Sequence, residues 1–111
     1  MKLQLKDIAY ARSGDKGRNS NIGLIFKNAN IYRWAKNNIT ANIVKKHLEY
    51  IVKGEVVRFE LDNLNALNFI LKDSLGGGGS DSLLNDAQGK THAQKLLLLK
   101  VNIPKEIEDY I

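Results

Sequence analysis

Apolar and polar residues alternate in four short segments of the chain, and this pattern predicts four β-strands. The segments are residues 3–11, 22–26, 55–61 and 67–71. Side chains alternate between the two faces of a strand, so a period of two is typical of a strand with one buried face. In the first segment the apolar phase changes between Leu5 and Ile8, which indicates an irregularity there. In the third and fourth, we expect Phe59 and Phe69 to lie in phase with the aliphatic core.

Two helices are predicted from apolar spacing and end signals. Thr40 is a good N-cap because its hydroxyl can accept a first-turn N–H, and Gly54 is a candidate left-handed stop. The apolar stripe between them consists of Ile43, Val44, Leu48 and Ile51. The second helix is predicted over residues 86–99, ending before Pro104. Residues 31–36 predict only a short helical turn.

The element order is therefore strand, strand, helix, strand, strand, helix (β-β-α-β-β-α). The economical packing of this order is an α+β ferredoxin-like plait, with two helices on one face of a four-stranded, mainly antiparallel sheet. At 111 residues the chain is expected to form a single domain over 1–111.

Composition excludes several classes of chemistry. The chain has no cysteine, so it can form neither a disulfide nor a thiolate zinc site, and it has no thiol nucleophile. His47 and His92 are not spaced as a metal pair, so no metal or other cofactor is expected. No apolar run approaches the roughly 20 residues that span a bilayer, and residues 1–10 lack a signal-peptide apolar region. We expect a soluble cytoplasmic protein without membrane contact.

The net charge of +5 is unevenly distributed along the chain. Residues 1–53 hold eleven Lys and Arg against three Asp and Glu (+8), whereas residues 54–111 hold six against nine (−3). This asymmetry favours an anionic partner near the first half or a complementary subunit. A solvated basic helix face is the alternative.

The polar segment 12–21 is the first candidate site, and we expect it to be a loop. Gly14 and Gly17 permit positive φ, which would let consecutive backbone N–H groups form an anion-binding nest. Asp15 is able to accept a proton, bind a cation or pair with a neighbouring base. The nearby positive charges are Arg12, Lys16 and Arg18. An ordinary hairpin loop is the alternative.

A second glycine-marked segment runs from residue 76 to residue 91. Four successive glycines, residues 76–79, are entropically costly and fit close approach of a ligand, another chain or a lid. The sequence Gly89-Lys90-Thr91 is like the end of a P-loop, but that motif requires glycine where Leu84 stands, so we reject an NTPase. A helix start near Asp86 would still favour an anion. Asn68 faces away from the apolar side of its strand, either lining a site or simply facing solvent.

Several segments, in order, resemble the small C-terminal domain of the acyclic-terpene-utilisation (AtuA) family. They are Ile8-Ala9-Tyr10-Ala11-Arg12-Ser13-Gly14-Asp15-Lys16-Gly17 with Asn21-Ile22-Gly23, residues 63–69, residues 75–79, and Asp86-Ala87-Gln88-Gly89-Lys90-Thr91 with Ala93-Gln94. The resemblance covers most of the chain and implies a ferredoxin-like fold. Longer members carry this domain after a large N-terminal domain, which this chain lacks. The resemblance therefore implies that this chain is a detached small subunit, which pairs with a separately encoded, larger AtuA-like chain.

The family is associated with catabolism of isoprenoid and other branched acids as CoA thioesters. The resemblance thus implies an accessory subunit of an acyl-CoA or organic-acid catabolic enzyme, with a small carboxylate or CoA substrate bound at a shared site. The candidate catalytic residues are Asp15, as acid or base, and Lys16. The candidate substrate-binding residues are Arg12, Ser13, Gly14, Gly17, Asn21, Asn68, Gly76, Gly77, Gly78, Gln88, Gly89, Lys90 and Thr91. The hypothesis requires the segment around Asp15 and the helix start around Lys90 to meet in one cationic, amide-lined hollow.

Three alternatives stay open at this point. The first is that the chain forms a homo-oligomer. The second is that it is a structural or regulatory partner that binds no ligand. A basic nucleic-acid-binding plait is the third, but RNA-binding sheets expose aromatic residues for base stacking. Phe59 and Phe69 are expected in the core, which disfavours nucleic acid. The missing large domain argues against catalysis by this chain alone.

Overall fold

A computed structural model describes residues 1–16, 19–73 and 82–111; the side chains of residues 15–16 and 82–89 lie outside the description. The main sheet contains β2 (Ala9–Lys16), β3 (Asn19–Phe26), β4 (Val56–Leu61) and β5 (Ala66–Leu71). Its spatial order is β2-β3-β5-β4, and every neighbouring pair is antiparallel. The other elements are α1 (Ala29–Asn38), α2 (Ala41–His47), α3 (Ser82–Leu97), α4 (Lys105–Glu108) and a separate ribbon of β1 (Lys2–Gln4) with β6 (Lys100–Asn102).

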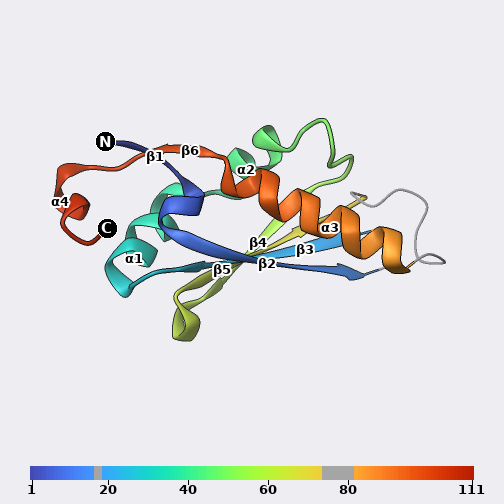
Figure 1. Cartoon of the computed structure of the whole chain (residues 1–111), viewed down its shortest axis with the longest axis horizontal. Coiled ribbons are helices and arrows are strands. Elements are labelled where there is room, and N and C mark those ends of the chain that lie inside the picture. The colour runs from blue at the N-terminus through green and yellow to red at the C-terminus, as the bar shows by residue number, and fades with distance from the viewer. Residues whose placement is uncertain (17–18, 74–81) are drawn as a thin grey trace.

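Helices α1, α2 and α3 cover one face of the main sheet, and the core lies between these layers (Figure 1). Leu24, Leu67 and Phe69 enter it from the central strands and are fully buried. Ile31, Val44 and Leu96 meet them from the three helices and are fully buried as well. The predicted α+β ferredoxin-like plait is confirmed. The helix predicted between Thr40 and Gly54 is the shorter α2, which ends at His47, and α1 is a further helix before it. No described helix is both long and apolar enough to cross a membrane.

The irregularity expected in the first strand is a 3-10 turn at Leu5–Asp7, which divides the segment into β1 and β2. β1 leaves the main sheet and pairs with β6, and Leu5 N donates to the Leu99 carbonyl at 3.0 Å. The predicted helix end at Leu99 is therefore wrong by two residues. The pairing joins residues about a hundred positions apart, so local periodicity contains no signal for it.

The segment predicted as a polar loop is mostly a β-hairpin. β2 continues to Lys16 and β3 begins at Asn19, with Arg12 opposite Gly23 and Gly14 opposite Asn21. A sheet with one uncovered face accepts polar side chains at every second position, so polarity alone does not predict a loop here.

The helices between β3 and β4 agree only in part with their end signals. Thr40 caps α2 as predicted, its hydroxyl accepting from Ile43 N at 3.2 Å. The short turn predicted at residues 31–36 is instead part of the ten-residue helix α1, whose cap Asn28 accepts from Ile31 N at 3.0 Å. Gly54 does not adopt the left-handed conformation predicted for it. It approaches β5 instead, donating its N–H to the Lys72 carbonyl at 2.9 Å.

Replacing Gly54 with alanine is expected to lower the free energy of unfolding by about 1–3 kcal/mol. A Cβ at this position would lie 2.8 Å from the Lys72 carbonyl oxygen and 3.0 Å from its carbonyl carbon, so the backbone must move. Gly14→Ala is the matched control, because a Cβ there meets nothing within 4 Å. Urea unfolding of both variants measures the effect; equal stabilities would contradict the close approach.

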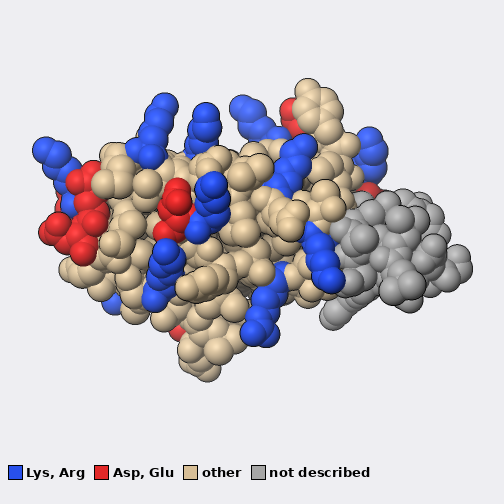
Figure 2. Space-filling model, in the orientation of Figure 1, with Lys and Arg blue, Asp and Glu red and all other residues tan. Residues whose placement is uncertain are grey.

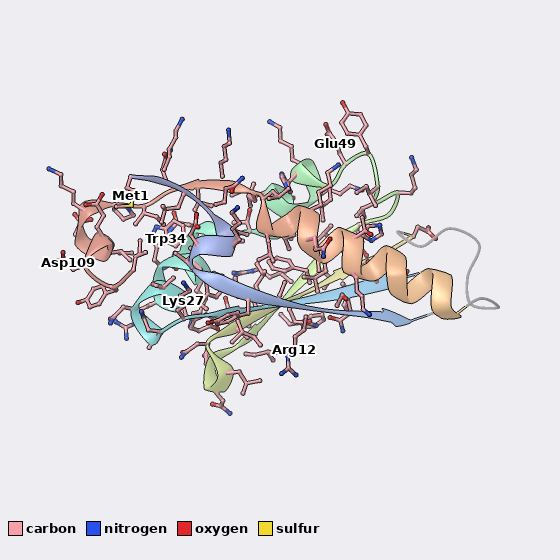
Figure 3. All side chains as sticks on the ribbon, in the orientation of Figure 1. Met1, Arg12, Lys27, Trp34, Glu49 and Asp109 are labelled. Carbon is pink, nitrogen blue, oxygen red and sulfur yellow. The ribbon has the colours of Figure 1, made fainter. Side chains whose placement is uncertain are left out.

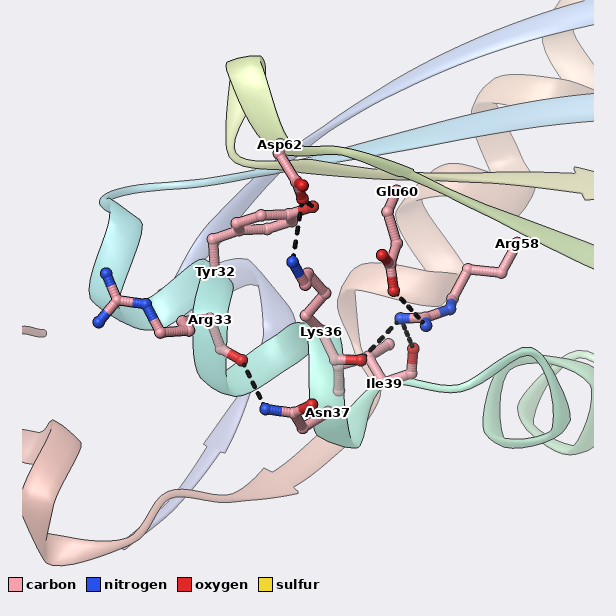
Figure 4. Close-up of polar contacts among 8 residues, drawn as sticks. All are labelled: Tyr32, Arg33, Lys36, Asn37, Ile39, Arg58, Glu60 and Asp62. Carbon is pink, nitrogen blue, oxygen red and sulfur yellow. Dashed lines mark hydrogen bonds and ion pairs between the residues drawn. The ribbon is translucent and has the colours of Figure 1, made fainter.

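A cluster of polar side chains connects α1 to the turn between β4 and β5 (Figure 4). Tyr32 Oη donates to Asp62 Oδ1 at 2.6 Å, and Lys36 Nζ donates to the same oxygen at 3.1 Å. Burial and the neighbouring carboxylate raise the pKa of Tyr32 to about 12, so its hydroxyl stays protonated and able to donate. Arg58 donates to the carbonyl of Lys36 at 2.9 Å, which ties β4 to the end of α1. The β4–β5 turn, which carries Leu64, is thereby held against the helix layer.

Candidate functional site

The uncovered face of the main sheet is lined by three rows of residues that run across all four strands. The strand register defines them. The rows are Tyr10, Ile25, Ala66 and Leu61; then Arg12, Gly23, Asn68 and Phe59; then Gly14, Asn21, Ile70 and Val57. The middle row is polar at Arg12 and Asn68, and the first row is apolar apart from the tyrosine hydroxyl.

These rows enclose a shallow hollow of about 310 Å³. Gly23 lies in its middle, between Arg12 and Asn68, where a Cβ would sit 3.8 Å from Asn68 Oδ1. The hollow is formed because Gly23 has no side chain and Ala66 has only a methyl group, so neither residue fills the space above the sheet. Figure 3 shows Arg12 pointing away from α3, on the uncovered side. One wall is polar and the other apolar; the lining side chains are Arg12, Asn21 and Asn68 on the first, and Ile25, Leu61 and Leu64 on the second.

Among the residues that the structure describes, the three polar side chains of the hollow have no partner. Within the described residues, Arg12, Asn21 and Asn68 form neither an ion pair nor a side-chain hydrogen bond. A guanidinium presents paired N–H donors that match a carboxylate, and each amide adds two donors and an acceptor. Such a set is suited to binding a small anion, and Arg12 is the one charged residue in the described lining.

Exposed apolar side chains border the hollow on two sides. Tyr10 is 64% exposed, Leu64 61% and Phe59 46%. The prediction that Phe59 belongs to the core is therefore wrong, because it pairs with Asn68 on the uncovered face. The alternation along β4 does not say which of its two sets of side chains faces the helices. Only the pairing of β4 with β5 decides this. Leu64 continues the apolar wall beyond Leu61, whereas Tyr10 and Phe59 stand on the two opposite edge strands of the sheet.

The predicted site residues separate into groups. Arg12, Ser13, Gly14, Asn21 and Asn68 all line the hollow; Ser13 stands opposite the buried Ile22, so it contributes backbone. Asp15 pairs with Ser20 and Lys16 with Asn19 through the backbone, while their side chains lie outside the description. Gly17, Gly76, Gly77 and Gly78 also lie outside the described residues. Binding by the first group stays a prediction, and its members do lie together.

The remaining group lies on α3, across the sheet from the hollow. This helix begins at Ser82 rather than near Asp86, so the residues expected at its start are in its interior. Their backbone N–H groups point along the helix to carbonyls one turn earlier and are not free for an anion. The residues concerned are Gln88, Gly89, Lys90 and Thr91. The amide-lined hollow expected at a helix start around Lys90 is therefore not formed. Glycine within a helix costs only about 1 kcal/mol, so Gly89 does not end it.

Ser20 and His92 form a buried polar pair that the sequence did not indicate. Ser20 Oγ lies 3.3 Å from His92 Nδ1, and the two residues are 0% and 5% exposed. The contact joins β3 to α3 beneath the sheet, where Ala93 and Leu96 also pack. Burial, followed by the charge of Lys95, lowers the pKa of His92. The signal in the sequence that could have indicated the burial of His92 is its spacing: it lies one residue before Ala93 and four before Leu96, on the same side of the helix.

His92 is expected to make stability fall on acidification. Because its pKa is lower in the folded chain, the unfolded chain binds the extra proton first as the pH drops below about 6.5. The contribution is complete above that pH and decreases by at most about 1.4 kcal/mol per pH unit below it. Denaturant unfolding between pH 8 and pH 5 measures the slope, with His92→Gln as the variant that removes it. An unchanged slope in His92→Gln would contradict this role.

The described lining of the hollow carries the charge of Arg12, and many other charged side chains are spread over the face seen in Figure 2. In the view of Figure 2, Lys and Arg side chains stand along the upper edge and across the front, while acidic side chains gather at the end that carries α4. The acidic residues of that segment are Glu106, Glu108 and Asp109. The basic excess predicted for the first half of the chain thus forms no continuous track on this face.

An antiparallel four-stranded sheet with helices on one face and a polar–apolar hollow on the other defines an α+β plait with a candidate site on its free face. The chain matches the model of the AtuA ferredoxin-like domain over residues 3–102 and belongs to this family. The resemblance predicted from the loop motifs is thereby confirmed. Neither the curated proteins nor the solved structures include a match to this chain.

Proposed function

We propose that this chain is the anion-binding small subunit of an organic-acid or acyl-CoA catabolic enzyme. The observation that carries the proposal is the gathering of Arg12, Asn21 and Asn68, all without a protein partner among the described residues, around a hollow whose middle is Gly23. Polar groups held on sheet strands are well positioned and need little reorganisation to receive a ligand. Family membership supports the same metabolic class.

A second chain, larger and AtuA-like, is proposed to close the hollow. The hollow is open on one side, and the exposed Tyr10 and Leu64 stand at its border. Covering such side chains would remove apolar surface from water and raise the strength of the Arg12 interaction by excluding solvent. The described lining holds no carboxylate or imidazole for acid–base work. Catalytic groups would come from the large chain, with Lys16 as the candidate on this one, because Asp15 pairs with the buried Ser20 in the register of the covered face.

Nucleic-acid binding is the second candidate, because the structure exposes two aromatic side chains on the free face, Tyr10 and Phe59. They lie on the two edge strands, three strand spacings or about 14 Å apart. The central strands carry Gly23, Ala66 and Asn68 at the facing positions, so no aromatic pair is close enough to stack neighbouring bases. The small-anion function fits this arrangement better.

An NMR titration of the ¹⁵N-labelled chain tests the proposal with sodium butyrate, inorganic phosphate, coenzyme A and a decameric oligouridylate. Butyrate or coenzyme A is expected to shift the amides of Arg12, Gly23 and Asn68. Arg12→Gln is expected to weaken binding about tenfold or more, since a charge-assisted bidentate contact is lost. Arg33→Gln, which changes an exposed arginine on α1, is the matched control and should leave affinity unchanged.

Two results would overturn the proposal. One is the absence of shifts on the free face with every small anion up to tens of millimolar. The other is binding of the oligonucleotide alone, with shifts at Tyr10 and Phe59, which would establish the nucleic-acid function instead.

A further inference from the structure

We infer that the ligand of the free face is a free monocarboxylic acid with an uncharged aliphatic body, rather than a CoA thioester. The inference rests on the proposed function and narrows it to one substrate class. It follows from the division of the hollow into a polar wall with a single charge and an apolar wall across Gly23.

The polar wall matches a single carboxylate. Its described lining contains one guanidinium, that of Arg12, and no acidic side chain, so one negative charge is neutralised. Asn68 lies in the same row as Arg12 with only Gly23 between them, and Asn21 lies in the next row. The guanidinium fork donates to the two carboxylate oxygens, and the side-chain amide N–H groups donate to the oxygen lone pairs that the fork leaves free. A phosphate dianion would keep an uncompensated charge here.

The apolar wall matches a short hydrocarbon chain. Ile25 and Leu61 belong to the row next to that of Arg12, about 7 Å further along the strands, and Leu64 lies beyond Leu61 in the turn. A ligand with its carboxylate at Arg12 therefore lays its body over Gly23 and Ala66 toward these side chains. A polar body in this direction would lose hydration without gaining a partner.

The hollow is too small to hold a whole CoA by itself. Its volume of about 310 Å³ equals that of about ten water molecules at liquid density. A fatty acid of about six to eight carbons fills such a space, whereas CoA is several times larger and carries phosphates that the described lining has no second cation to meet.

A chain-length series tests this inference. Dissociation constants are measured by calorimetry or NMR for acetate, butyrate, hexanoate and octanoate, with hexyl phosphate and coenzyme A as comparisons. Each added methylene is expected to tighten binding about two- to fourfold until the hollow is filled, because burying one CH₂ is favourable by about that factor. Leu64→Ser is expected to flatten this dependence, and Arg12→Gln is expected to weaken the binding of all the acids alike.

The outcomes separate this inference from the proposed function. If acetate and octanoate bind equally at Arg12, the aliphatic body is refuted while anion binding stands. If coenzyme A binds more tightly than hexanoate, the inference that the ligand is a free acid is refuted, and a CoA thioester is favoured instead. If none of the probes binds on the free face, both proposals fail together. Tyr50→Ser controls for loss of an exposed apolar side chain elsewhere, since Tyr50 is 83% exposed on the segment after α2.

Discussion

Phe69→Ala is expected to lower the free energy of unfolding by about 3–5 kcal/mol, as the loss of a large buried aromatic ring usually does. Phe69 is fully buried on the central strand β5, and it is among the largest of the completely enclosed side chains. Its core neighbours come from both the sheet and the helices, including Leu24 and Leu96. Since small domains are stable by only about 5–15 kcal/mol, the variant should be close to the limit of folding.

Phe59→Ala provides the matched control on the neighbouring strand. Phe59 is 46% exposed and points to the uncovered face, so its truncation leaves no enclosed cavity. We expect a change of less than about 1 kcal/mol, in the range of surface substitutions. Urea unfolding of the two variants measures the difference directly. Similar losses for both would mean that Phe59 is buried and that the phase assigned to β4 is incorrect.

Gly23→Val is expected to weaken ligand binding by about a hundredfold while the fold remains intact. The side chain would rise from the middle of the hollow, between Arg12 and Asn68, where the proposed ligand crosses. A Cβ at this position meets Asn68 Oδ1 only at an ordinary contact distance of 3.8 Å, and the face above is open. Glycine is unfavourable inside a strand and valine is favourable, so stability should stay equal or rise.

The measurement for Gly23→Val combines hexanoate titration with denaturant unfolding. A hundredfold loss of affinity corresponds to about 2.7 kcal/mol of binding free energy. Gly14→Val, at the border of the hollow rather than in its middle, is the graded control and should have a smaller effect. Full affinity in Gly23→Val would show that no ligand passes over this position.

The two faces of the main sheet differ in role: one contributes to the core and the other carries the candidate site. The covered face carries the core, including the Ser20–His92 contact that joins β3 to α3. The free face needs no apolar residues for stability, so it can carry Arg12 and two asparagines on rigid strands. The cluster of Tyr32, Lys36 and Asp62 holds the β4–β5 turn, and with it the apolar wall of the hollow.

Most elements were predictable because their signals are local. The cap at Thr40 and the alternation in β5 are each contained in a few consecutive residues. The candidate site was predictable in part for the same reason: Asn68 lies out of phase with the apolar residues of its own strand. Gly23 was missed as a member of the site, although the resemblance contained it, because a glycine inside a strand has no chemical group to indicate a role.

By itself, the amino-acid sequence determined the α+β class, the order of the main strands and helices, and the family. Periodicity, caps and turn residues act over a few positions, so they can be read from the sequence without knowledge of any long-range contact. Only the tertiary structure decided which face of β4 is covered, that β1 pairs with β6, and that α3 begins at Ser82 and lies across the sheet from Arg12. Those outcomes depend on pairing and packing between residues far apart in the chain, where competing arrangements have the same local pattern and differ only in the surface that they bury together.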